Sequence, residues 1–170
     1  GSNAESGSLR HRFAAGKGWF GRIPLFFAYF PQGTVQDSVP ASRRAPFHAH
    51  NVTDGQIVVL DSGHSISYNN KEQVDFLKTH LQRRKLCSFV VYHVPARPSF
   101  GSWDSSANNH PKSVWLPEFE RYNVAVAYEH HVHAHKRTAP LLSNGTVNYM
   151  RGTVFLGDGM FGLVSGAHPQ

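Results

Sequence analysis

Apolar and polar positions become regular only after about residue 50, and from there they predict alternating strands and helices. Three apolar runs, at 56–61, 86–93 and 124–128, are typical of strands that are covered on both faces. Between the first two, residues 70–85 predict a helix with Val74, Leu77 and Leu81 on one stripe. Pro111 suits the first turn of a second helix before the third strand. This order predicts an α/β fold in which helices pack on a sheet.

The two ends of the chain show a weaker pattern. Residues 1–50 surround aromatic pairs with Gly, Ser, Pro and Arg, and they are interpreted as an irregular, loop-rich lead-in with short strands. Residues 51–170 form the second unit of this division. Within that unit, residues 146–150 and 153–156 are predicted to form a terminal hairpin.

Composition and charge narrow the function classes. The 170 residues carry a formal charge of +6, but Lys and Arg are spread along the chain without a nucleic-acid motif, so we expect no nucleic-acid partner. No apolar run approaches the ~20 residues that span a bilayer, so no membrane span is expected. Glycosylation sequons begin at Asn51 and Asn144, and they favour an extracytoplasmic or secreted location.

Histidines follow two of the predicted strands, where open α/β sheets bind ligands. His93 follows the second strand, and His130, His131, His133 and His135 follow the third. Neutral imidazole is the commonest metal ligand, and alternation in an extended segment would turn His131 and His133 to the same side. A histidine at a strand end is more often an ordinary surface residue. The spacing alone therefore leaves open a metal site, a chance surface site for transition metals, and no site.

The residue motifs in these segments resemble those of one protein family. Residues 131–138, HVHAHKRT, resemble the GHxHxYxR-T segment of purple acid phosphatases in the calcineurin-like metallophosphoesterase superfamily. Residues 92–95, YHVP, resemble the earlier metal-binding histidine segment, and 115–124 the helix before the GHxH strand. The resemblance covers residues 50–165 in the family's order. It implies the C-terminal half of the catalytic domain, which is half of a four-layer α-β-β-α sandwich.

The resemblance also implies a chemistry. His93 and His131 would bind one metal ion and His133 the other, in a pair of divalent or trivalent ions such as Zn, Fe or Mn. His110 would contact the phosphate or protonate the leaving group. The substrate would be a phosphate ester, hydrolysed as by an acid phosphatase or a phosphodiesterase.

The sequence departs from the family's pattern in two ways. The D-x-H and GNH motifs, which with the family's GD motif supply the bridging aspartate and other ligands, do not occur in these residues, and all three precede the present segments in the family's order. The resemblance then implies an incomplete site, an isolated chain without activity, and a missing N-terminal half on an upstream segment or a separate chain. His130 and His135 stand where the family has glycine and tyrosine, and a side chain at the glycine position would strain the turn if φ were positive.

Two alternatives stay open. The chain is a metallophosphoesterase-like module that has lost catalysis and serves a structural or cell-surface binding role, or it is an unrelated domain whose histidines bind metal opportunistically.

Overall fold

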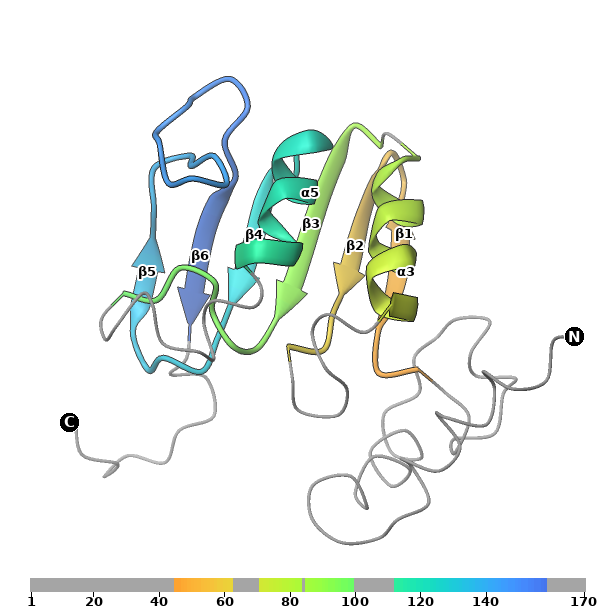
Figure 1. Cartoon of the computed structure of the whole chain (residues 1–170), viewed down its shortest axis with the longest axis horizontal. Coiled ribbons are helices and arrows are strands. Elements are labelled where there is room, and N and C mark those ends of the chain that lie inside the picture. Colours follow the sequence, from red (N-terminus) through yellow and green to blue (C-terminus); the bar gives the residue numbers. More distant parts are fainter. Residues whose placement is uncertain (1–44, 63–70, 84, 100–111, 159–170) are drawn as a thin grey trace, which may run out of the picture.

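A computed structural model describes residues 45–62, 71–83, 85–99 and 112–158. These residues form a six-stranded sheet and two helices (Figure 1), which confirms the predicted α/β class. The elements are β1 (His48–Val52), β2 (Gly55–Val59), α3 (Lys71–Leu81), β3 (Cys87–Tyr92), α5 (Leu116–Arg121), β4 (Val126–Glu129), β5 (His135–Arg137) and β6 (Val154–Asp158).

The sheet is mainly parallel. Its strand order is β1-β2-β3-β4-β6-β5, in which β2, β3, β4 and β6 run parallel and the edge strands β1 and β5 run antiparallel to their neighbours. The carboxyl ends of the four parallel strands therefore lie along the same edge of the sheet, at the bottom of Figure 1.

Both helices cover the same face of the sheet. The chain advances in one direction through β2, α3, β3, α5 and β4, and strand–helix–strand crossovers are almost always right-handed. Successive right-handed crossovers in one direction place their helices on one side, as Figure 1 shows for α3 and α5. In the described part of the chain, the opposite face has no helix above it.

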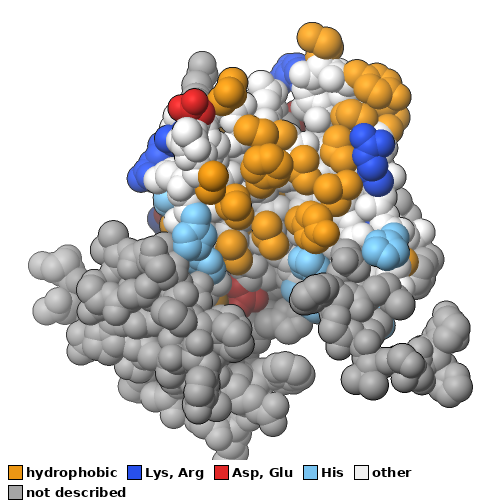
Figure 2. Space-filling model, turned by 180° about the vertical axis from the view of Figure 1, so that it is seen from behind, with side chains coloured by type: hydrophobic (Ala, Val, Ile, Leu, Met, Phe, Trp, Pro, Cys, Tyr) orange, Lys and Arg blue, Asp and Glu red, His pale blue; other side chains and the backbone are white. Residues whose placement is uncertain are grey.

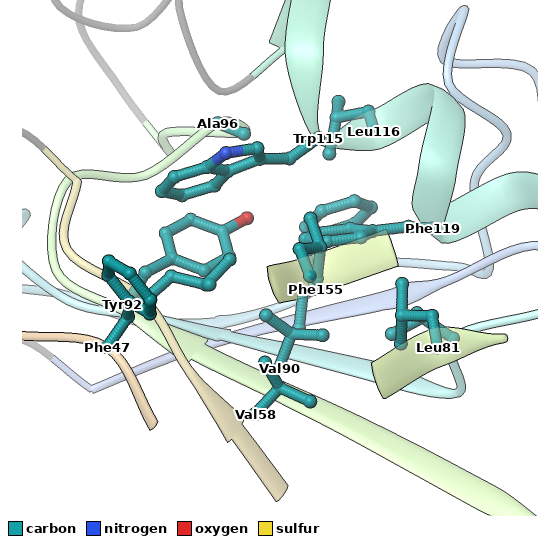
Figure 3. Close-up of a cluster of buried hydrophobic side chains, with 14 residues drawn as sticks. Phe47, Val58, Leu81, Val90, Tyr92, Ala96, Trp115, Leu116, Phe119 and Phe155 are labelled. Carbon is teal, nitrogen blue, oxygen red and sulfur yellow. The ribbon is translucent and has the colours of Figure 1, made fainter. Parts of the chain in front are cut away.

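The core lies between this sheet and its helices. Alternate strand residues point toward the helices, and Val58, Val90 and Phe155 are buried there beneath Trp115 and Phe119 (Figure 3). The ring of Tyr92 lies edge-on to that of Trp115, with centroids 5.2 Å apart, a favourable geometry for aromatic pairs.

The intervening strand residues point the other way, and they are apolar too. Ile57, Phe89, Val91, Val126 and Tyr128 line a shallow hollow on the uncovered side, which we call the open sheet face. Figure 2 shows hydrophobic side chains across it. Phe89 is 39% exposed, although it lies on β3, a strand in the middle of the sheet. Parallel sheets are normally covered on both faces, and a large exposed apolar surface usually marks an interaction site. We therefore expect a second layer of protein to pack on this face.

The strand and helix predictions fare well in the middle of the chain. The runs at 56–61, 86–93 and 124–128 are confirmed as β2, β3 and β4, and the helix predicted at 70–85 as the shorter α3. The second predicted helix is confirmed as α5; Pro111 lies outside the described residues. Short strands were expected in residues 1–50 without bounds, and β1 begins at His48, at the end of that stretch.

The predicted terminal hairpin is wrong. Residues 146–150 contain turns instead of a strand, because the Asn148 side chain accepts hydrogen bonds from the backbone N–H groups of Met150 and Arg151, both 3.0 Å long. The antiparallel partner of β6 is β5, which comes earlier in the chain.

The division at residue 50 remains a prediction. β1 crosses that point and pairs with β2, while residues 1–44 lie outside the described part of the chain. None of the described helices is long and apolar enough to cross a membrane.

The two faces of the sheet predict different costs for removing an aromatic ring. Phe119 is 1% exposed, so Phe119→Ala should lower the free energy of unfolding by about 3–5 kcal/mol. Phe89→Ala, on the open sheet face, should cost less than about 1 kcal/mol in the isolated chain. Urea denaturation of both variants measures the difference. An equal cost would mean that another part of this chain covers the open sheet face.

Candidate metal site

Two of the predicted ligands meet at the carboxyl edge of the sheet. His93 directly follows β3, and His131 lies two residues after β4. The Nε2 atom of His93 is 3.1 Å from the Nδ1 atom of His131, and the two rings are nearly perpendicular, with centroids 5.1 Å apart. Both residues are exposed to solvent.

Strand register brings the two histidines together. Tyr92 and Glu129 are partners in the parallel pairing of β3 with β4, so the residues that follow them leave the sheet side by side. The backbone N–H of His130 donates to the carbonyl oxygen of His93 over 3.0 Å, which extends the contact beyond the last strand pair. The ring of His130 is stacked with that of His93, with centroids 6.4 Å apart.

The segment after β4 is folded into tight turns, so the expectation of an extended segment is wrong. The N–H of Val132 donates to the carbonyl of His130 over 2.6 Å, and that of Ala134 to the carbonyl of Val132 over 2.7 Å. Hydrogen bonds from residue i+2 to residue i define three-residue γ-turns, here centred on His131 and His133. Alternation along a strand therefore does not decide where these two rings point.

The residue with a positive φ in this turn is His131. The sequence comparison had indicated His130, at the family's glycine position, as the residue where strain would arise. His131 has φ of 62°, and His130 is not among the described residues with positive φ. A left-handed backbone is costly for a residue with a Cβ, by roughly 1–2 kcal/mol. The side chain at His130 therefore introduces no such strain, and the cost is concentrated at one member of the histidine pair.

The structure shows no contact of the other described candidate ligands, His133 and His135, with this histidine pair. His133 and His135 are exposed. Among the described residues, no three His, Cys, Asp or Glu side chains gather closely enough to hold a metal ion. The assignment of His133 to a second ion remains a prediction, and His110 lies outside the described residues.

The histidine pair fits two neighbouring positions around one ion. Zn–N bonds of about 2.0–2.1 Å place two nitrogens about 2.9–3.4 Å apart, for ligand angles between about 90° and about 109°. The observed 3.1 Å lies inside this range, and without a metal it also suits a hydrogen bond between the rings. Further ligands for a complete site would have to come from outside the described residues.

A buried charge pair flanks the histidine turn in the sequence, and the apolar pattern did not predict it. Glu129 is fully buried and pairs with Lys136, which is also mostly buried. The phenol of Tyr92 donates to Glu129 over 2.5 Å. Burial, with the nearby charge of Glu129, raises the pKa of Tyr92 well above its ordinary value, so this phenol stays protonated. The available signal was a glutamate ending an otherwise apolar strand.

Comparison with known proteins bears on the fold. No family model matches the sequence, and no curated protein sequence matches it. Among solved structures, a purple acid phosphatase from yellow lupin (Lupinus luteus) seeds superposes with a TM-score of 0.54 at 17% identity. The alignment covers 76% of this chain, which spans only 28% of the lupin protein. The fold is similar to part of this phosphatase. At this identity the likeness shows the fold alone, and the described sheet with its two helices is consistent with half of a metallophosphoesterase sandwich.

The pair geometry predicts that one ion uses both rings. His93→Ala and His131→Ala should each weaken Zn²⁺ binding by about 10-fold or more, because each removes one of two nitrogens that chelate together. The double variant should lose less than the sum of the two single losses in binding free energy, since either change already breaks the chelate. Isothermal titration calorimetry measures the dissociation constants. His135→Ala is the control, and additive losses from the two histidines would contradict a shared ion.

Proposed function

We propose that this chain provides the metal-binding C-terminal half of a phosphate-ester hydrolase, an acid phosphatase or a phosphodiesterase. The observation that carries the proposal is the contact between His93 Nε2 and His131 Nδ1 at the carboxyl ends of adjacent parallel strands. It occurs in a metallophosphoesterase-like fold, at the edge where α/β sheets bind ligands.

The residues take distinct parts in the proposed chemistry. His93 and His131 hold and orient one ion, and His133 serves the second. His110 contacts the phosphate or gives a proton to the leaving oxygen. A dinuclear centre of Zn, Fe or Mn would supply an activated water and stabilise negative charge on the phosphoryl oxygens.

The proposal includes a partner, the N-terminal half of the same domain, on an upstream segment or a separate chain. Close-spaced cations need anionic ligands to offset their repulsion. Glu129, the carboxylate nearest the pair in sequence, is already buried against Lys136. The partner would provide the missing carboxylates and a second sheet. The open sheet face offers an apolar surface for that second layer.

A catalytically inactive structural or binding module is the second candidate. Its motivation was His130 at the family's glycine position. That argument is weakened here, because the positive φ belongs to His131 and the His130 side chain meets no such backbone strain. Activity of the completed protein decides between the two candidates.

We also propose an extracytoplasmic or secreted location. Asn51 and Asn144, the sequon asparagines, are both exposed, so neither would need unfolding to be glycosylated. Mass spectrometry of the native protein tests this: both asparagines unmodified would leave the location without support.

The hydrolase proposal predicts activity only in the presence of the partner. Residues 1–170 alone should show no metal-dependent hydrolysis of a chromogenic phosphate ester with Zn²⁺, Mn²⁺ or Fe, because the described ligands are neutral nitrogens from two histidines. Co-expression with the upstream segment should restore hydrolysis, and His131→Ala should reduce the restored rate by at least about 100-fold. His135→Ala is the matched control on the same segment.

Two results would go against this division of the site. Robust turnover by the isolated chain, lost in His131→Ala, would show that the chain carries a complete site. Inactivity with and without the partner, while Zn²⁺ still binds, would favour the inactive module.

A further inference from the structure

The carboxylate of Glu129 is the centre of a buried network at the end of β4. Its Oε1 atom accepts hydrogen bonds from the Tyr92 hydroxyl at 2.5 Å and from the backbone N–H groups of Ala96 at 2.7 Å and Arg97 at 3.2 Å. Its Oε2 atom contacts the ammonium group of Lys136. Both oxygens are therefore engaged, and the side chain has no exposed surface.

Lys136 ties the same network to the edge strand β5. Its ammonium group also donates to the carbonyl oxygen of Arg97 over 2.5 Å. The guanidinium group of Arg97 continues outward, donating to the carbonyl oxygens of Leu142 and Ser143 at 3.2 and 2.6 Å. One carboxylate thus joins the loop after β3 to the strands on either side of the histidine turn.

The network fixes the chain on both sides of His93 and on both sides of His131. His93 lies between Tyr92 and Ala96, both of which donate to Glu129. His131 lies within the six-residue stretch between Glu129 and Lys136, whose side chains are joined to each other by the ion pair. A chain closed at both ends has few backbone conformations, so it can hold the left-handed turn at His131.

We propose that Glu129 is a positioning residue, paired with Lys136, that holds the His93 and His131 rings at metal-chelating distance. The inference rests on the proposed metal site, but it assigns Glu129 a role different from that of a ligand. To reach an ion in front of the rings, the carboxylate would have to abandon three hydrogen bonds and its ion pair in the interior. A buried carboxylate without its partners is strongly disfavoured.

The test uses single and paired neutral substitutions in the 170-residue chain. Glu129→Gln and Lys136→Met each leave one buried charge without its partner, and each should weaken Zn²⁺ binding by about 10-fold, the size of effect that loss of an outer-shell residue of a metal site has. The double variant leaves neither charge, so its affinity should return toward that of the wild type. Tyr92→Phe removes a single hydrogen bond, and it should stay folded with a smaller loss.

Matched controls come from the helix layer. Glu120→Gln changes a carboxylate on α5 that accepts hydrogen bonds from Ser143. Lys78→Met removes the more exposed ion pair between α3 and Glu118, whose charged atoms are 3.5 Å apart. Neither should change the affinity for Zn²⁺, although the first neutralises a hydrogen-bonded carboxylate and the second removes an ion pair.

A second readout needs no metal. Nitrogen NMR of the imidazole rings should show the hydrogen bond between His93 and His131 in the wild type, its loss in Glu129→Gln and Lys136→Met, and its return in the double variant. If the four proteins show this pattern but the wild type does not bind Zn²⁺, the metal-site proposal fails. The role of Glu129 in positioning the two rings then still holds. An intact ring contact in both folded single variants would overturn the positioning role. Loss of Zn²⁺ binding in Glu129→Gln that the double variant does not recover, with the ring contact intact, would identify Glu129 as a ligand.

Discussion

The parallel register of β3 with β4 is the constraint on which the candidate site depends. Tyr92 opposite Glu129 places both side chains on the helix-covered side of the sheet, where phenol and carboxylate meet. Because side chains alternate along a strand, a slip of one residue would turn Glu129 toward the open sheet face. It would also separate His93 from the histidine turn. The same pairing therefore sets the buried network and the exposed histidine pair.

The site combines two costly features with a rigid frame. His131 adopts a left-handed backbone, and Glu129 and Lys136 bring opposite charges into the interior. Such features cost on the order of 1–3 kcal/mol for the backbone alone and persist only where the surroundings determine them fully. Here the surroundings are the buried rings of Tyr92, Trp115 and Phe119 above adjacent strands. The core and the site are thus built from the same end of the sheet.

Sequence patterns predicted what depends on local apolar periodicity. The central strands and α3 followed from it because buried parallel strands are continuous apolar runs. The positions of the edge strands β1 and β5 were not predicted, because their segments, HAHNV and HKR, are polar and half exposed. The pairing of His93 with His131 followed from strand order. The turn at His131 and the Glu129–Lys136 pair did not, because neither a three-residue turn nor a single ion pair produces a periodic pattern of apolar residues.

Because the described helices cover only one face of the sheet, the open sheet face also affects how much of the protein a cell can maintain. Until the open sheet face around Phe89 and Val126 is covered, it presents the kind of surface that chaperones and quality-control proteases recognise. The steady-state amount of this polypeptide should therefore follow the supply of whatever covers that face more closely than it follows its own rate of synthesis. Because the described residues cover only one side of the sheet, the cellular amount of this polypeptide should depend on the layer that covers the other side.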